Sequence, residues 1–432
     1  MGQLLLISLR NLFQHRRRTL LLGSAIAFVT MLLVLLSSLF NGMQDTMLRS
    51  ATTLMTGHVN IGGFYKITAG SAAPVVTNYA KIEQIVRREI KGLDNVVVRG
   101  RGFGKVISDT TSLQGAINGI DITHEKGFRD VVQVRSGRLE DLAQPRTALI
   151  FESQAERLEV KVGDMLTLSS PTFRGVQNTV DVRIVAIGGD LGFMSNFMIF
   201  VNSEAIRDLY QLDVTTAGAL HLYLKDPEQA DAVAAKLRKV LLAEGYGVMD
   251  KVAQPYFHKF DTVKREDWVG QKLDLTTWID EMLFIRYTLQ TLSVLIAILV
   301  TVLLVIIVIG VMNTLWMAVR ERTREIGTLR AIGMQRGRIL AMFVIETALL
   351  ALGATLFGVL LATLLAAGVN AAEFVVPKGF QMFLMSDTLR LVVDVPTAVR
   401  SLLIISVITT LGSLEPAWRA ARLQPVTAMH AN

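Results

Sequence analysis

The stretch Leu289–Val319, LQTLSVLIAILVTVLLVIIVIGVMNTLWMAV, contains neither a charged residue nor a proline. An α-helix rises about 1.5 Å per residue, so this stretch exceeds the roughly 30 Å hydrocarbon thickness of a bilayer. It therefore predicts a membrane-spanning helix, within residues 288–319, that tilts or continues as helix beyond the membrane surface.

Three more apolar runs predict further spans, at Leu20–Phe40, Ile339–Val369 and Thr397–Leu414. A cleaved signal peptide is the alternative for Leu20–Phe40, but the run is longer than the apolar region of such a peptide and no A-x-A-like site follows it. Residues are 51% hydrophobic and 19% charged, which is too much charge for a fully embedded chain. The sequence predicts an α-helical membrane protein with one span, a large α/β periplasmic domain and then three more spans.

Arginine placement orients the predicted spans. Arginines precede the first span, fill the link between the second and third, and follow the fourth: Arg10, Arg16, Arg17, Arg18, Arg320, Arg322, Arg324, Arg330, Arg336, Arg338, Arg419 and Arg422. Because basic residues favour the cytoplasmic side, both termini (1–19 and 415–432) are predicted in the cytoplasm of a bacterium, while 41–287 and the loop 370–396 face the periplasm. This topology explains the net charge of +7, so no nucleic-acid partner is expected.

The residues before the first span predict an amphipathic helix. Within 1–19, Leu5, Leu9, Leu12 and Phe13 recur on one helical face, and arginines gather at the far end. This pattern is typical of a helix that lies in the inner membrane interface, in contact with lipid.

The region 41–287 predicts a folded α/β domain. Apolar residues at helical spacing mark Lys81–Lys91, and Asp226-Pro227-Glu228-Gln229 begins a second helix that stops at Gly245. Strands are predicted at Val96–Val98, Ala148–Phe151, Met165–Leu168, Val180–Ile187, Phe197–Val201 and Ala219–Leu224.

The order of these elements suggests an insertion. Residues 50–105 and 215–260 form one αβ subdomain in this interpretation, and a β-rich subdomain at 106–214 interrupts it. We expect helical stalks at Gly42–Met55 and Asp261–Tyr287 that connect the domain to the first and second spans.

Motifs for catalysis or cofactor binding are absent from the sequence. There is no GxxxxGK[ST], GxSxG or HExxH, the six histidines show no ligand spacing, and the lack of cysteine excludes disulfides and thiolate metal sites. We expect a non-catalytic chain that binds no metal or cofactor.

Glu346 lies in the third predicted span. Pairing with an arginine of the same subunit is favoured for it over a proton relay, because the spans carry few other polar groups.

The link at 320–338 contains the most informative motif, Arg320–Gly333 (RERTREIGTLRAIG). Ile326, Leu329 and Ile332 recur at three-residue steps, charged residues surround them, and Gly333 is a plausible C-terminal cap. A solvated loop is the alternative, but the pattern favours a short helix that docks on a partner. The candidate site residues are Arg320, Glu321, Arg324, Glu325, Ile326, Gly327, Leu329, Arg330 and Gly333, with Glu346 as an intramembrane polar residue.

This motif resembles the signature of the FtsX/MacB permease superfamily, and Pro416–Ala428 resembles the ending of the same family, with Thr427 in place of a frequent acidic residue. The resemblance implies a type VII ABC transporter in which the outer domain has a porter-like part. Two permease chains, identical or paralogous, would pair with two copies of a separate ATPase that binds the ATP and Mg²⁺. The segment 320–333 would be the coupling helix, and ATP hydrolysis would move the periplasmic domains by mechanotransmission.

The unfused form and the stretch Gly57-His-Val-Asn-Ile61 resemble the LolC/LolE lipoprotein-releasing branch, which implies release of lipoproteins towards an outer-membrane acceptor. Alternatives are MacB-like efflux of peptides or drugs with a periplasmic adaptor, and FtsX-like regulation of a cell-wall hydrolase. A membrane-anchored periplasmic enzyme ranks last, because no catalytic constellation is found.

Overall fold

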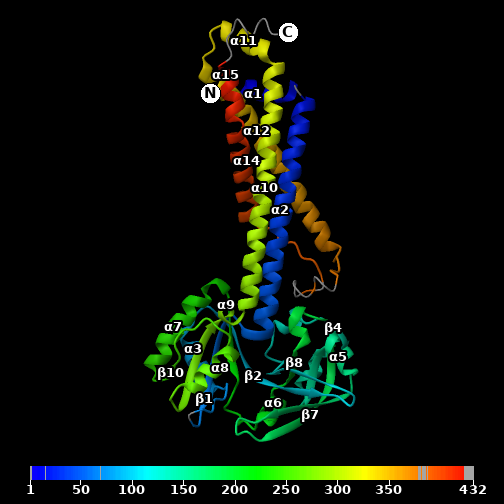
Figure 1. Cartoon of the computed structure of the whole chain (residues 1–432), viewed down its shortest axis with the longest axis vertical. Coiled ribbons are helices and arrows are strands. Elements are labelled where there is room, and N and C mark those ends of the chain that lie inside the picture. Colours follow the sequence, from blue (N-terminus) through cyan, green and yellow to red (C-terminus); the bar gives the residue numbers. More distant parts are fainter. Residues whose placement is uncertain are drawn as a thin grey trace. The chain divides into compact units, whose positions relative to one another are not determined.

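The computed structural model of the chain describes residues 2–14, 16–68, 70–377, 381, 386 and 388–422. The chain forms two units. The helical unit comprises Met1–Gln44, Leu289–Phe374 and Leu389–Asn432, and the α/β unit comprises Asp45–Thr288 and Val375–Thr388. Figure 1 shows the long helices of the first unit and the strands of the second.

The described helices of the helical unit include four that are long and apolar enough to cross a membrane, at Thr19–Thr56, Ile285–Glu321, Arg336–Ala371 and Val395–Ala421. The four predicted spans are therefore confirmed as helices. The elements are α1 (Gly2–Gln14), α2 (Arg16–Ala51), α10 (Leu283–Glu321), α11 (Thr323–Ala331), α12 (Arg336–Ala371), α14 (Val395–Gly412) and α15 (Leu414–Ala421).

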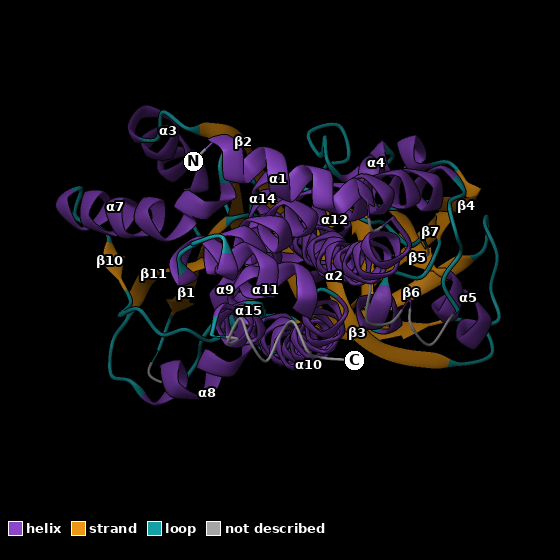
Figure 2. Ribbon diagram, turned by 90° about the horizontal axis from the view of Figure 1, so that it is seen from above, coloured by secondary structure: helices purple, strands orange, loops and turns teal. Residues whose placement is uncertain are grey.

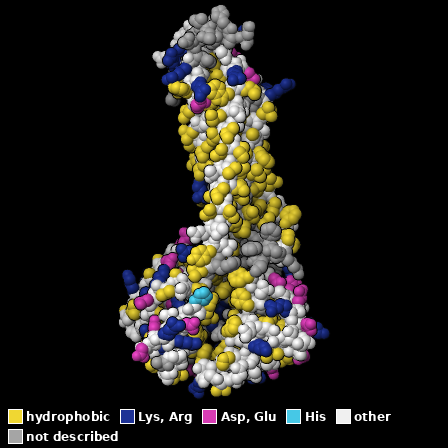
Figure 3. Space-filling model, viewed as in Figure 1, with side chains coloured by type: hydrophobic (Ala, Val, Ile, Leu, Met, Phe, Trp, Pro, Cys, Tyr) yellow, Lys and Arg dark blue, Asp and Glu magenta, His cyan; other side chains and the backbone are white. Residues whose placement is uncertain are grey.

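Apolar side chains from α2, α10, α12 and α14 form the core of the helical unit, among them Leu22, Ile26, Leu33, Val311, Ala354 and Ile405. The outer faces of these helices are also apolar, and Figure 3 shows hydrophobic side chains along them with Lys and Arg gathered at one end. Small residues bring the helices together: a Cβ at Gly358 of α12 would lie 2.5 Å from the Ala27 carbonyl oxygen of α2. The Thr355 and Ser406 hydroxyls, 3.1 Å apart, join α12 to α14.

The α/β unit is built on one eleven-stranded mixed sheet with the order β10-β11-β1-β9-β2-β3-β8-β5-β7-β4, and β6 pairs with β2 and β7. The strands are β1 (Val59–Lys66), β2 (Leu93–Ile107), β3 (Ser112–Ile120), β4 (Val134–Gly137), β5 (Thr147–Phe151), β6 (Met165–Pro171), β7 (Gln177–Gly188), β8 (Met198–Asn202), β9 (Ala219–Leu224), β10 (Gly247–Val248) and β11 (Gly270–Thr277). The helices are η1 (Thr52–Thr56), α3 (Tyr79–Glu89), α4 (Phe128–Val131), η2 (Leu139–Ala143), α5 (Glu152–Leu158), η3 (Gly192–Asn196), α6 (Ser203–Tyr210), η4 (Pro227–Gln229), α7 (Ala230–Ala243), α8 (Tyr256–Arg265) and α9 (Trp278–Glu281).

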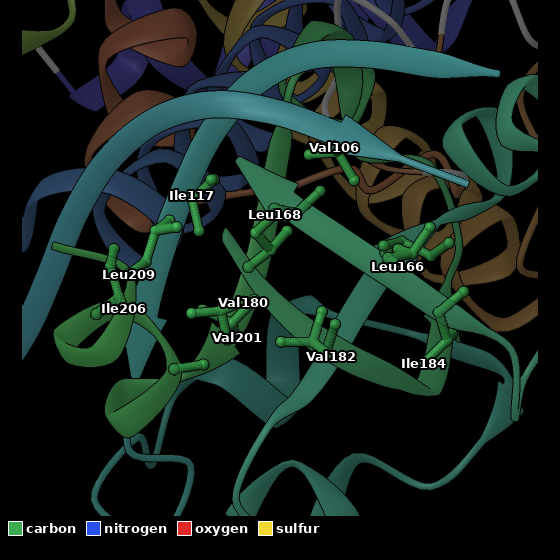
Figure 4. Close-up of a cluster of buried hydrophobic side chains, with 14 of the residues drawn as sticks. Val106, Ile117, Leu166, Leu168, Val180, Val182, Ile184, Val201, Ile206 and Leu209 are labelled. Atoms are coloured by element: carbon green, nitrogen blue, oxygen red, sulfur yellow. The ribbon is translucent and has the colours of Figure 1, made fainter. Parts of the chain in front are cut away.

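The strand β2 belongs to two subdomains. Its first half, up to Arg99, pairs with β9, and its second half, from Gly100, pairs with β3. Each subdomain has its own core: one draws on residues between Val59 and Val98 and between Leu220 and Trp278, and the other on residues between Val106 and Leu212. Figure 4 shows the second core, in which Val106, Ile117, Leu168 and Val201 converge from different strands.

In the first subdomain, α3 and α7 lie beside each other on one face of the strands, and α8 lies on the other side (Figure 2). The hydrogen bond from Arg88 Nη2 to Glu244 Oε1, at 2.5 Å, joins the ends of the two neighbouring helical segments. The predicted helix start is confirmed, because Asp226 caps η4 by accepting from the Glu228 amide at 3.1 Å. All six predicted strands are confirmed.

One predicted stalk is right and the other is wrong. The α-helix α2 continues into the π-helix η1, and the two together cover the expected Gly42–Met55 stalk. By contrast, most of Asp261–Tyr287 is not a stalk, because β11 runs through it and pairs with β1 over eight residues. The alternating LDLT segment of β11 buries Leu273 and Leu275 in the first core, and this sheet pairing outweighs the lack of helix breakers.

Candidate coupling site

The short helix predicted in this link exists as α11, and it is held by a small apolar core; docking on a partner stays a prediction. Ile326 of α11 belongs to one buried cluster with Val319, Ile339 and Phe343 from the flanking spans and with three alanines of α15, Ala417, Ala420 and Ala421. The helix is therefore packed against its own chain on one side.

Gly333 ends α11 in a Schellman motif. Its φ is +103°, a left-handed conformation that favours glycine. The Met334 amide donates to the Leu329 carbonyl at 3.0 Å, and the Gly333 amide donates to the Arg330 carbonyl at 3.1 Å. The prediction of a C-terminal glycine cap is confirmed.

The expected apolar stripe is divided between the interior and the surface. Ile326 is 1% exposed and Gly327 is buried, whereas Leu329 is half-buried and Ile332 is 79% exposed. Four charged residues of the motif are exposed: Arg320, Glu321, Arg324 and Glu325. The exposed side of this segment is therefore charged, with Ile332 as its most exposed apolar side chain, and Ile326 serves internal packing.

A buried charge connects α11 to the third span. Arg322, only 6% exposed, lies between α10 and α11. Its Nη1 is 3.2 Å from Glu346 Oε2 on α12, and its Nε is 2.9 Å from Glu325 Oε2 on α11. The guanidinium also lies 5.7 Å from the centre of the Phe343 ring. The predicted pairing of Glu346 with an arginine of the same subunit is confirmed.

The sequence reasoning missed Arg322 as a site residue. Spacing carried a usable signal: Glu325 follows Arg322 by one helical turn, and an acid in an apolar span needs a nearby cation. The motif contains four arginines, Arg320, Arg322, Arg324 and Arg330, and spacing alone did not identify the one that turns inward.

The helix α15 packs beside α11. In α15, Arg419 lies with its guanidinium 4.8 Å from the Trp316 ring of α10 and forms an ion pair with Glu415. Part of the predicted family ending, from residue 423 on, lies outside the described residues. Among the described residues there is no cluster of three or more His, Cys, Asp or Glu that suits a metal ion.

Comparison with known families covers most of the chain. Residues 293–425 match the family model of the FtsX-like permease C-terminal region, and residues 19–240 match that of the MacB-like periplasmic core domain. The second match alone covers more than half of the chain. The chain belongs to the FtsX/MacB-type permease family. Its four candidate spans and its periplasmic-type domain fit a protein of the inner membrane.

Several relatives that are similar in sequence to this chain carry the name MacB. The macrolide export ATP-binding/permease protein MacB of Sodalis glossinidius is 24% identical over 442 residues, which cover 98% of this chain and 60% of that protein. MacB 1 of Aeromonas hydrophila is 39% identical over 145 residues, 34% of this chain and 20% of that one. The pyoverdine export protein PvdT of Pseudomonas savastanoi is 34% identical over 142 residues, 33% of this chain and 19% of that one. This FtsX/MacB-type permease thus spans at most 60% of these relatives' length.

Solved structures of low similarity include the periplasmic region of MacB from Actinobacillus actinomycetemcomitans, with 12% identity and a TM-score of 0.31 over 44% of this chain and 85% of that one. The extracellular domain of the transporter YknZ from Gram-positive bacteria has 14% identity and a TM-score of 0.30, over 50% of this chain and 98% of that one. The resemblance to the LolC/LolE branch stays a prediction.

Proposed function

We propose that this permease couples ATP hydrolysis by an ABC-type ATPase to a conformational change of its α/β unit, and so moves amphipathic molecules outward from the inner membrane. The observation that carries the proposal is the Arg322–Glu346 ion pair, which joins α11 to the third span while the charged residues of α11 and Ile332 stay exposed. The chain itself is proposed to be non-catalytic, with ATP and Mg²⁺ bound by the ATPase.

The buried Arg322–Glu346 pair mechanically connects α11 to the membrane-spanning helices α10 and α12. Arg322 follows α10 directly, contacts Glu325 of α11 and reaches Glu346 of α12. Breaking a buried ion pair leaves an uncompensated charge at a cost of about 3–5 kcal/mol. A partner that displaces α11 therefore moves α10 and α12 with it, since separation of the three elements is more costly than joint motion.

The membrane orientation in this proposal follows the arginines. α11 lies on the cytoplasmic side, where ATP is available, and the α/β unit lies in the periplasm. Two permease chains and two ATPase copies form the proposed assembly. In α1, Leu6 and Phe13 are more than 60% exposed, which suits contact with lipid at the inner interface.

The proposed cargo follows the names of the relatives, which are exporters of macrolides and pyoverdine. Export with a periplasmic adaptor is therefore preferred to lipoprotein release. The stretch that favoured lipoprotein release has a structural explanation: Gly57 adopts a φ of +63° at the end of η1, and Val59, Asn60 and Ile61 are buried in β1. Lipoprotein release remains the second candidate, with retention of outer-membrane lipoproteins in the inner membrane after depletion as its distinguishing result.

The docking proposal is tested with the substitution Ile332→Asp. Tagged permease is purified from native membranes, the co-purified protein with a GxxxxGK[ST] motif is identified by mass spectrometry, and its vanadate-sensitive ATPase activity is measured. We expect Ile332→Asp to lose most of the ATPase. Val214→Asp is the matched control, because Val214 is 75% exposed and lies in the α/β unit. Equal recovery of ATPase with both variants would refute docking through α11.

A further inference from the structure

A cavity of about 700 Å³ lies within the α/β unit, between its two subdomains. The first subdomain lines it with side chains of α8, and the second lines it with residues of the second half of β2 and of β3, β6 and α6. This volume falls in the range of about 300–1,000 Å³ that is typical of small-molecule sites.

Aromatic rings form much of the cavity wall. Phe103 and Phe257 are 60% and 52% exposed, which is high for large apolar side chains in a folded domain. In the same cavity wall, Phe173 stacks on Tyr210 with ring centres 4.8 Å apart. The Tyr210 hydroxyl is fixed by hydrogen bonds with the Phe103 backbone, at 2.9 and 3.0 Å, and with Ser170, at 2.9 Å. The wall is apolar and held in place, as in a formed binding site.

One end of the cavity is polar and carries Arg101 and Glu281, both less than 9% exposed. The Glu281 carboxylate is already occupied: it accepts from the Asn60 amide at 3.2 Å, from the Thr276 hydroxyl at 2.7 Å and from the Tyr256 backbone amide at 3.3 Å. Burial raises the pKa of Glu281. Glu281 is therefore a poor attachment point for a cationic ligand.

Arg101 has only neutral partners within hydrogen-bond distance among the described residues. Its Nη2 donates to Asn60 Oδ1 at 2.7 Å and lies 3.2 Å from Nε2 of His221. Burial, together with Arg99 and Arg101, lowers the pKa of His221 well below its usual value, so this ring is neutral and accepts the hydrogen bond. A second cation, Lys264, lines the same cavity with its Nζ 4.9 Å from the Phe260 ring.

We propose that this cavity binds a single-chain amphiphile with an anionic end group, such as a fatty acid or a lysophospholipid. The apolar chain packs against Phe103, Phe173 and Phe257, and the anionic group faces Arg101 and Lys264. The cavity carries two cationic side chains, Arg101 and Lys264, and one carboxylate, Glu281, which already accepts hydrogen bonds from the protein. This balance favours an anionic end group over a cationic or neutral one. The inference does not rest on the proposed ATPase coupling, because binding is measured on the permease alone.

The cavity lining also includes residues from the two chain segments that connect the α/β unit to the first and second spans. Met55 and Thr56 belong to η1, which follows α2, and Glu281 belongs to α9, which precedes α10. A bound amphiphile therefore contacts chain segments that lead directly to the first and second membrane helices.

Photolabelling of the full chain in lipid nanodiscs tests this site. The probes are a diazirine-bearing C16 fatty acid, the matching alcohol and a lysophosphatidic acid with the same chain, and adducts are mapped by peptide mass spectrometry. We expect adducts of both acidic probes on the cavity-lining segments, and competition by unlabelled palmitate. Labelling by either acidic probe supports the anionic end group, and the comparison of the two identifies the headgroup.

Two matched pairs of variants accompany the labelling. Phe257→Asp should abolish cavity adducts, whereas Leu242→Asp on α7, an equally exposed position at 52%, should not. Lys264→Glu should reduce labelling by the acidic probes about fivefold, as expected for a charge contact of roughly 1 kcal/mol, and leave the alcohol probe unchanged. Lys239→Glu is its control. Adducts confined to the membrane spans, or cavity labelling that is equal for acid and alcohol and insensitive to Lys264→Glu, would overturn the proposal.

Discussion

At the residue scale, three buried ion pairs among the described residues connect different segments of the chain. Arg99 pairs with Glu125 at 2.6 Å and also donates to the carbonyls of Thr53 and Leu54 in η1, at 2.6 and 2.7 Å. Lys259 pairs with Asp274, and Arg322 with Glu346. Each pair is nearly inaccessible to water, so its value lies in fixing the position of the elements that it joins.

The Arg322–Glu346 pair gives a prediction that separates stability from coupling. Arg322→Met should destabilise the permease by about 3–5 kcal/mol, because it removes one member of a buried ion pair and leaves the charge of Glu346 in place. The double variant Arg322→Met/Glu346→Leu should recover most of that loss, since no charge remains. Unfolding in detergent, followed by circular dichroism, measures both. Losses that simply add in the double variant would show that the pair is not energetically coupled.

At the element scale, α12 and α2 approach each other through Gly358. A Cβ at this position would meet the Ala27 carbonyl oxygen at 2.5 Å and the Thr30 Cβ at 2.8 Å, both in α2. Backbone atoms cannot yield as a flexible side chain does. The close contact therefore depends on the absence of a side chain, as in other packed membrane helices.

Gly358→Ala should separate α2 from α12 and lower stability by about 1–3 kcal/mol, the usual cost of overpacking. Gly353→Ala is the matched control on the same helix, because a Cβ there meets nothing within 4 Å. Thermal unfolding of the two variants in the same detergent compares them. A similar melting temperature for both would contradict the inferred α2–α12 contact.

Elements with a strong local pattern could be predicted from the sequence. The spans, the strand Ala219–Leu224 and the cap at Gly333 each follow from residues within a few positions of one another. By contrast, β11 could not be predicted, because its partner β1 is about 200 residues away. The same reason applies to Arg322, whose inward direction depends on Glu346 one helix later. Long-range pairing decided both, and a single sequence shows no such pairing.

At the scale of the whole molecule, the orientation in the membrane is the prediction on which the proposed function depends most. The chain has no cysteine, so single cysteines can be introduced without a background. A cysteine at exposed Thr110 should react with a membrane-impermeant maleimide in intact spheroplasts, whereas one at exposed Thr328 should react only after lysis. The reverse pattern would place the α/β unit in the cytoplasm and refute the proposed coupling.

The continuity of β2 has a consequence for how the α/β unit deforms. A single strand of 15 residues is shared by both subdomains, so no flexible linker separates them there. Rotation of one subdomain against the other must twist this ribbon about its own axis, and the restoring force grows with the angle. At Gly100, Gly102 and Gly104 neighbouring residues pack directly on the backbone of the ribbon, because a Cβ there would lie 2.2 Å from Ile206, 2.4 Å from Tyr210 and 2.6 Å from Ser169. A continuous strand of this kind therefore acts as a torsion spring: it stores elastic energy when the two subdomains rotate against each other, and releases it when they return.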